Sequence, residues 1–312
     1  MKIVCFGTGA FGIPSFEALT ARHEIIQIVT APDKPRGRAL RVFSSPVKVW
    51  AQSRGLTCFQ PADIRAETAA QSLKAFGADV FLVIAYGYLL PKSILSIPRV
   101  MALNLHASLL PRYRGAAPVH WAILNGERET GVSVIRMVEP LDAGEILIQK
   151  KTPIAPEDDI FSLRERLSRI GAHAVTEALE ILEKGRANFF SQDESLVTQA
   201  RKLTKEDGRL RWSDSAEKIS NQVRALKDWP GSYAFYKKKR FLILSAVPDS
   251  AVKKNKDWKP GRVLRASAAA GLLLAAGDGA LRIEKLQLEG RQPLEARDFL
   301  NGFPIEEGGF FE

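Results

Sequence analysis

The stretch DVFLVIAYGYLLPKSILSIPRVMALNLH, residues 79–106, contains two almost continuous apolar runs joined by a short segment. These runs lie at 79–85 and 100–105, and uninterrupted Val, Ile and Leu of this kind are typical of parallel strands covered on both faces. Similar runs predict strands at 2–7 and 24–30. The segments between strands predict helices near 13–22, 45–54, 65–76 and 117–125. This alternation predicts an α/β sheet of mostly parallel strands with helices on both faces.

Two more strand-like runs and one long helical segment follow. Strands are predicted at 131–137 and 145–150, separated by VEPLDAG, whose Pro and Gly mark a turn. Apolar residues recur every three or four positions through 159–184, which predicts an amphipathic helix. The polar segment after it lacks periodicity, which is typical of a connection. We therefore expect a first domain at 1–188 and a linker at 189–208.

The last third of the chain, residues 209–312, predicts a second domain. One helix is expected near 214–226, followed by several short strands punctuated by Gly, Pro and Asp. Strands at such spacing are typical of a small β-barrel, here of an OB-like kind. The expected strands lie near 233–236, 240–247, 261–266, 271–275 and 280–288.

The composition is that of a globular protein. The 312 residues are 46% hydrophobic and 26% charged. No apolar run approaches the roughly 18 residues that span a bilayer, and the start MKIVCFGTGAFG does not resemble a signal peptide, so we expect a cytoplasmic protein. Cys5 and Cys58 are the only cysteines, and two isolated thiols predict neither a disulfide framework nor a cysteine metal site.

Positive charge is concentrated towards the end of the chain. The formal net charge is +10, and residues 201–312 hold 22 Lys and Arg against 15 Asp and Glu. An excess of positive charge attracts polyanions through its field and through counterion release. Nucleic acid is therefore a candidate partner.

The loop Gly7-Thr8-Gly9-Ala10-Phe11-Gly12 matches the pattern G-x-G-x-x-G between a strand and a helix. Such a loop can bind a pyrophosphate, which makes an NAD(P)-dependent oxidoreductase an alternative. The supporting acidic residue after the second strand is matched only loosely by Asp33, which Lys34 follows at once. In the other interpretation the glycines only form a tight turn.

Polar residues at the end of the strand at 100–105 are the strongest candidates for chemistry. Asn104 and His106 are two residues apart, so in a strand they project to the same side. They lie at its carboxyl end, where open α/β sheets place their sites. Ser108-Leu-Leu-Pro111 follows directly. Asp142, in a predicted turn, would by itself indicate no function.

Together these residues resemble the folate-dependent formyltransferases, whose pattern Asn-x-His-x-Ser-Leu-Leu-Pro is followed at a distance by Asp-x-Gly. Members that act on initiator methionyl-tRNA are similar over essentially the whole chain. The further matching segments are Ala31–Pro35, Ser45–Lys48, Ala85–Gly87, Arg114–Pro118 and Trp229–Pro230. The family commonly opens with Gly-Thr-Pro where this chain has Gly7-Thr8-Gly9, which puts the geometry of that turn in doubt.

The resemblance implies transfer of a formyl group from 10-formyltetrahydrofolate to the α-amino group of methionine on initiator methionyl-tRNA, with a Rossmann-like catalytic domain and a tRNA-binding barrel. In such a reaction an amine attacks the formyl carbon and an oxyanion develops. Asn104 and His106 supply donors for that oxyanion, and Asp142 can orient His106 and help to remove the amine proton. No covalent intermediate is required, and we expect no metal, because the remaining histidines lack ligand-like spacing.

The folate is expected to meet the turn after the catalytic strand, as the resemblance implies. That turn contains Ser108, Leu109, Leu110 and Pro111. The end of the preceding strand, Tyr86 and Gly87, is placed to line the same cleft. The Tyr86 ring could form an aromatic wall for a pterin or could belong to the core, and the sequence leaves both open.

The acceptor must be inferred from the periphery. Cations gather in a predicted surface loop and in the barrel, as expected of a protein that binds a polyanion such as tRNA. We expect the enzyme to be a monomer. A second barrel cluster is Lys253-Lys254-Asn255-Lys256. A formyltransferase for a sugar-nucleotide amine is the main alternative, and a non-catalytic RNA-binding module would leave Asn104 and His106 without a purpose. The residues expected to bind tRNA are Lys34, Arg36, Arg38, Arg41, Lys237, Lys238, Lys239 and Arg240.

Overall fold

The computed structural model describes residues 1–36, 41–252 and 258–312, which form two compact units. Unit 1 comprises Met1–Pro118, Glu129–Pro153 and Arg164–Arg201. Unit 2 comprises Val119–Arg128, Ile154–Leu163 and Lys202–Glu312.

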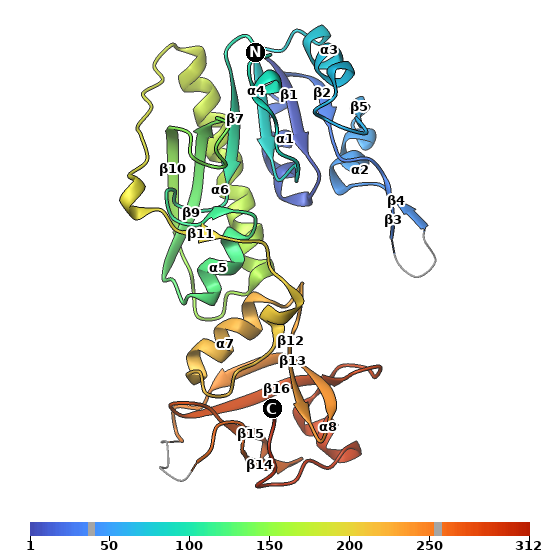
Figure 1. Cartoon of the computed structure of the whole chain (residues 1–312), viewed down its shortest axis with the longest axis vertical. Coiled ribbons are helices and arrows are strands. Elements are labelled where there is room, and N and C mark those ends of the chain that lie inside the picture. The colour runs from blue at the N-terminus through green and yellow to red at the C-terminus, as the bar shows by residue number, and fades with distance from the viewer. Residues whose placement is uncertain (37–40, 253–257) are drawn as a thin grey trace. The chain divides into compact units, whose positions relative to one another are not determined.

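A seven-stranded sheet forms the centre of unit 1, in the order β10-β9-β7-β6-β1-β2-β5 (Figure 1). Five neighbouring strands, β7, β6, β1, β2 and β5, run parallel, whereas β9 is antiparallel to both β7 and β10. The mostly parallel sheet predicted from the sequence is confirmed. The strands are β1 (Lys2–Gly7), β2 (Glu24–Val29), β5 (Cys58–Phe59), β6 (Val80–Ile84), β7 (Met101–His106), β9 (Glu129–Arg136) and β10 (Ile146–Pro153).

Helices cover both faces of this sheet, as the apolar strands require. On one face Val4 and Phe81 pack in one core cluster with Leu73 of α3 and Ile94 of α4. The other face meets α6, because a Cβ on Gly171 would lie 2.6 Å from the Leu105 side chain in β7. The helices of unit 1 are α1 (Ile13–Leu19), α2 (Pro46–Ser53), α3 (Glu67–Ala75), α4 (Lys92–Leu95) and most of α6 (Ile160–Glu183), whereas α5 (Pro118–Leu124) belongs almost entirely to unit 2.

The predicted basic surface loop at 34–41 is partly strand. Residues Lys34–Arg36 form β3 and Arg41–Phe43 form β4, and the two pair antiparallel as a hairpin. The sequence did not predict this hairpin because it has no apolar alternation that would indicate a sheet. Residues 37–40, which include Arg38, lie outside the described residues.

The first part of the predicted linker packs within unit 1. Phe190 forms a β-bridge with Ile146. Further on, β11 (Gln199–Ala200) pairs in parallel with β8 (Arg114–Gly115). Between them lies the short helix η2 (Glu194–Leu196). We call residues 189–201 the strap. Unit 1 ends at Arg201, inside the predicted linker.

Unit 2 contains an antiparallel sheet that closes into a barrel. The path β12-β13-β16-β15-β14 leaves β12 and β14 as the two edges. The end of the chain joins those edges, because Phe311 bridges Tyr236 of β12 and Phe310 bridges Arg262 beside β14. The small barrel predicted from the sequence is confirmed. Its elements are α7 (Ala216–Ala225), β12 (Ser232–Tyr236), β13 (Lys239–Pro248), β14 (Val263–Ser267), β15 (Gly271–Ala275), β16 (Ala280–Leu288), β17 (Leu294–Glu295) and α8 (Ala296–Gly302).

Within the described ranges, no helix is both long enough and apolar enough to span a lipid bilayer.

The turn after β1 explains the glycine pattern at 7–12. A Cβ on Gly7 would lie 2.8 Å from the Phe16 ring, and one on Gly12 would lie 3.1 Å from the Ile84 Cβ. These two glycines therefore allow α1 to approach the sheet closely. A Cβ on Gly9 would meet nothing within 4 Å, and Gly9 has φ −79° and ψ 165°. Proline can adopt this conformation, so the turn is compatible with the proline that is usual at this position in the family.

We predict that Gly9→Pro stabilises the protein by about 0.4–1 kcal/mol, because proline restricts the unfolded chain without straining this turn. The free energy of unfolding in urea measures the effect. Gly7→Ala is the matched control and should destabilise, since its new methyl group would press on the Phe16 ring. A loss of more than about 1 kcal/mol in Gly9→Pro would contradict the proposed turn geometry.

Candidate active site

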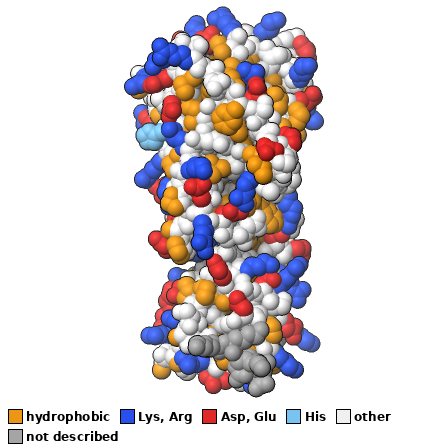
Figure 2. Space-filling model, turned by 90° about the vertical axis from the view of Figure 1, so that its left-hand side faces the viewer, with side chains coloured by type: hydrophobic (Ala, Val, Ile, Leu, Met, Phe, Trp, Pro, Cys, Tyr) orange, Lys and Arg blue, Asp and Glu red, His pale blue; other side chains and the backbone are white. Residues whose placement is uncertain are grey.

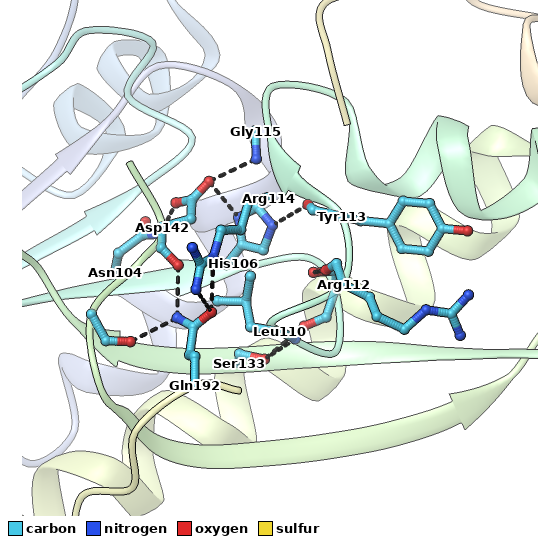
Figure 3. Close-up of polar contacts among 12 residues, drawn as sticks. Asn104, His106, Leu110, Arg112, Tyr113, Arg114, Gly115, Ser133, Asp142 and Gln192 are labelled. Atoms are coloured by element: carbon cyan, nitrogen blue, oxygen red, sulfur yellow. Dashed lines mark hydrogen bonds and ion pairs between the residues drawn. The ribbon is translucent and has the colours of Figure 1, made fainter. Parts of the chain in front are cut away.

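Asn104 and His106 project from the same side of β7, as their spacing predicts (Figure 3). β7 lies between two neighbours, so its backbone is held from both sides: Asn104 pairs with Val83 of β6, and His106 pairs with Ser133 of β9. Both side chains are thus carried by a rigid central strand of unit 1.

Asp142 reaches these two side chains from the loop that connects β9 and β10. Its Oδ1 accepts from Asn104 Nδ2 at 3.4 Å, and its Oδ2 lies 3.5 Å from His106 Nδ1. The backbone amide of Gly115 donates to Oδ2 at 2.9 Å. The side chain of Asp142 is only 7% exposed. The structure therefore brings together the three residues that the sequence predicted to be catalytic.

The backbone of the Asp142 loop has a conformation that few residues adopt. Asp142 has φ +54°, in the left-handed region. Two residues later, a Cβ on Gly144 would lie 1.7 Å from the carbonyl oxygen of Arg136. Only glycine fits there, which explains the Asp-x-Gly spacing in physical terms.

The contacts of His106 fix which ring nitrogen carries a proton. Nε2 lies 2.9 Å from the carbonyl oxygen of Tyr113, and a carbonyl can only accept, so Nε2 must donate. Nδ1 then faces Asp142 and can donate to it only in the imidazolium form. At 3.4 and 3.5 Å, the contacts of Asp142 with the two β7 side chains are longer than ordinary hydrogen bonds. The three side chains converge without closing tightly on one another.

Ser133, which is fully buried, forms hydrogen bonds to the backbone of the turn after β7. Its hydroxyl donates to the Ser108 carbonyl at 2.7 Å and accepts from the Leu110 amide at 3.1 Å. Gln149 of β10 also donates to this hydroxyl and to the Leu110 carbonyl. The Leu110–Pro111 peptide bond is cis. Strands β9 and β10 thus shape the turn predicted to meet the folate.

The strap completes the site in a way that the sequence did not predict. Thr198 accepts from the amide of Tyr113 through its hydroxyl and from the amide of Arg114 through its carbonyl, both at 2.9 Å. Gln192 donates to the carbonyl groups of Asp142 and Gly144.

The sequence of the strap indicated only a connection, because its polar residues show no periodicity. For Ser133, the available signal was a serine inside the apolar run at 131–137, where a polar residue indicates a buried hydrogen-bonding role.

The predicted folate-binding residues are near one another but not equally accessible. Pro111 and Leu109 are partly exposed, and Gly87 is exposed with φ +87°, whereas Ser108 and Leu110 are buried. The Tyr86 ring packs against Phe6 and is 3% exposed, so it belongs to the core, and burial raises the pKa of its phenol to about 12. Tyr88, which is 40% exposed, was not predicted from the sequence to contact the folate.

The cations predicted to bind tRNA differ in their surroundings. In unit 1, Lys34 Nζ donates to the Tyr88 hydroxyl at 3.2 Å, and Arg36 and Arg41 belong to the hairpin. The turn between β12 and β13 in unit 2 carries Lys237 and Lys238, both with positive φ. Lys237 forms an ion pair with Glu306, and Lys239 lies over the Phe303 ring. Arg240 lies over the Tyr233 ring and forms an ion pair with Glu289. The cluster Lys253–Lys256 lies outside the described residues.

Asp33, the loose match to a ribose-binding acid, is already engaged within unit 1. Lys48 Nζ lies 2.5 Å from its carboxylate and Gln60 donates to it at 3.0 Å. Hydrogen bonding to Lys48, and then to Gln60, lowers the pKa of Asp33. The carboxylate oxygens of Asp33 are therefore already bound by other side chains. Together with the packing role of Gly7 and Gly12, this leaves the oxidoreductase alternative without support.

Two family models match the chain: formyl transferase over residues 1–179, and formyl transferase, C-terminal domain, over residues 202–304. The chain belongs to the formyl transferase family, as its motifs predicted. It is similar to methionyl-tRNA formyltransferase from Citrifermentans bemidjiense, with 40% identity over 310 residues that cover 99% of this chain and 96% of that protein.

Two solved structures show the same fold at low identity. An N-formyltransferase from Helicobacter canadensis, in complex with folinic acid and dTDP-3-aminofucose, has a TM-score of 0.67 at 16% identity and covers 91% of this chain and 98% of its own. HypX from Aquifex aeolicus, in complex with tetrahydrofolic acid, has a TM-score of 0.63 at 20% identity, over 100% of this chain and 50% of its own.

We predict that Ser133→Ala destabilises the protein by about 1–3 kcal/mol, because it leaves the buried amide of Leu110 and carbonyl of Ser108 without their shared partner. Urea unfolding measures the loss. The control is Ser53→Ala, which removes an exposed hydroxyl from α2 and should change stability by less than about 0.5 kcal/mol. Equal effects of the two substitutions would show that Ser133 does not support the turn.

Proposed function

We propose that this chain transfers the formyl group of 10-formyltetrahydrofolate to the α-amino group of methionine on initiator methionyl-tRNA, for the initiation of translation. One observation carries the proposal: the Asn104 amide and the His106 ring of β7 converge on the carboxylate of Asp142. They do so in a chain that is 40% identical over almost its whole length to a methionyl-tRNA formyltransferase.

The proposed reaction forms one C–N bond and breaks another. The neutral amine attacks the formyl carbon, and negative charge develops on the formyl oxygen. When this intermediate collapses, the bond to the folate nitrogen breaks and that nitrogen takes a proton. Overall, the amine loses one proton and the leaving nitrogen gains one.

Each proposed catalytic residue suits one part of this reaction. The Asn104 amide can donate to the developing oxyanion, and so can His106 Nδ1 in its imidazolium form. Asp142 is the acceptor nearest to both and can receive the proton of the amine directly or through water. Because the carbonyl of Tyr113 holds Nε2 of His106, the ring presents Nδ1 towards the reacting groups.

The folate is proposed to bind at the turn after β7. This chain's own contribution is a backbone shaped by Ser133, with the partly exposed Leu109 and Pro111 at its surface. Gly87 and the Tyr88 ring offer further contacts from the end of β6. The absence of a metal requirement stays a prediction, as do the monomeric state and the cytoplasmic location.

The tRNA is proposed to contact cations of both units, as predicted from the sequence. On the face shown in Figure 2, blue and red side chains are interspersed, so the described atoms of that face form no large patch of one sign. The proposed contacts are therefore local clusters at the β3–β4 hairpin and at the β12–β13 turn. Within the part of the chain that the structure describes, Lys238 is exposed and has no charged partner.

The acceptor is tested by a direct competition. The chain is incubated with 10-formyltetrahydrofolate and equal concentrations of initiator methionyl-tRNA and an amino-sugar nucleotide, and both products are quantified. Formylation of the tRNA alone is expected. Preferential formylation of the sugar would support the alternative acceptor, for which the Helicobacter canadensis protein offers only a shared fold.

We predict that His106→Ala and Asn104→Ala each lower kcat by about 10²–10³, with little change in the affinity for folate, because both side chains are proposed to act in the transition state. Steady-state kinetics and equilibrium folate binding measure the two effects separately. Turnover close to that of the unsubstituted chain would remove either residue from the mechanism.

We predict that Arg38→Ala and Lys238→Ala weaken tRNA binding and reduce the slope of log K against log salt by about 0.7–1 for each cation removed. The KM for folate should stay the same. Lys237→Ala removes the same charge one residue away, but Lys237 is paired with Glu306, so its effect should be smaller. An unchanged salt slope in Arg38→Ala and Lys238→Ala would show that these cations are ordinary surface residues.

A further inference from the structure

Gln192 of the strap makes every hydrogen bond that its amide group allows. Its Nε2 donates to the carbonyl oxygens of Asp142 and Gly144, both at 2.7 Å. Its Oε1 accepts twice from the Arg114 guanidinium, from Nε at 2.9 Å and from Nη2 at 2.7 Å. A primary amide has two hydrogens and two acceptor positions, so no capacity is left over.

Arg114 determines which way the amide of Gln192 points. Its side chain is 9% exposed, and it also binds Glu194 through Nη2 at 2.7 Å and Nη1 at 3.2 Å. Because a guanidinium can only donate, the atom of Gln192 that faces it must be oxygen. The NH₂ group is therefore directed at the Asp142 loop (Figure 3).

The loop that Gln192 holds has a conformation that needs support. Asp142 has φ +54°, and residues other than glycine adopt this region at an energetic cost that the surroundings must offset. The two carbonyls bound by Gln192 belong to Asp142 itself and to Gly144, so Gln192 holds the backbone from which the carboxylate projects. The backbone amide of Gly115 in β8 donates to the carboxylate itself.

We propose that Gln192, oriented by Arg114, is a positioning residue that sets the Asp142 carboxylate at its distance from His106 and Asn104. This inference rests on the proposed function, in which Asp142 takes part in the transfer. The strap is then part of the active site rather than a connection. Gln192 touches the loop through its backbone and acts on the reaction only through Asp142.

The most selective test is Gln192→Glu, which keeps the shape of the side chain and its acceptors for Arg114. It replaces the two donated hydrogens by a carboxylate oxygen that faces two carbonyl oxygens. We expect kcat for formyl transfer to methionyl-tRNA to fall roughly 10- to 100-fold, as for a misplaced catalytic group. The KM for folate should change little. Gln71→Glu introduces the same chemical change at an exposed position of α3, outside the strap and the site, and should leave kcat unchanged.

A double-substitution cycle separates positioning from general support of the fold. If Gln192 acts only through Asp142, then adding Gln192→Glu to Asp142→Asn should reduce kcat no further. Equal additional losses in both backgrounds would overturn the proposal, and so would normal kcat in Gln192→Glu. If the Glu variant does not fold, Gln192→Met carries the same comparison. Failure of the unsubstituted chain to formylate methionyl-tRNA would instead reject the proposed function.

Discussion

The candidate site depends on the correct placement of one nearly buried carboxylate, that of Asp142. Removing a carboxylate from water is costly unless donors replace the lost hydration. Three such groups lie near Asp142 on two segments of unit 1: the amide of Asn104 and the ring of His106 in β7, and the backbone amide of Gly115 in β8. The conformations of β7, of Gly115 and of the Asp142 loop all follow from the need to place these groups around the carboxylate. The sheet fixes β7, the pairing of β8 with β11 fixes Gly115, and the strap holds the loop.

The antiparallel strand β9 is what brings the loop to the site. In an all-parallel sheet the neighbour of β7 would be followed by a crossover helix. Here β9 runs back beside β7 and turns into β10, so residue 142 returns to the side chain of Asn104. The turn can be this tight because Gly144 has no Cβ to strike the Arg136 carbonyl. The same two strands supply Ser133 and Gln149 to the turn after β7.

Much of this could be predicted from the sequence, for identifiable reasons. The strands of the sheet are continuous apolar runs, and the two β7 side chains follow from the two-residue period of a strand. Asp142 was predicted only through family resemblance, because its role depends on a contact between segments 38 residues apart. Gln192, Thr198 and the β3–β4 hairpin were not predicted, since a single polar residue in an irregular segment carries no periodic signal. The ring of Tyr86 could have been core or cleft, and packing against Phe6 decided for the core.

The charge of Asp142 is the most direct point at which to test the mechanism. Asp142→Asn keeps the size of the side chain but removes the acceptor for the amine proton and the negative charge beside His106. The measurement is the single-turnover rate of formyl transfer from 10-formyltetrahydrofolate to methionyl-tRNA, with binding of both substrates measured separately. We expect the rate to fall by about 10²–10⁴ while both substrates still bind. An unchanged rate would contradict the role of Asp142 and of the residues arranged around it.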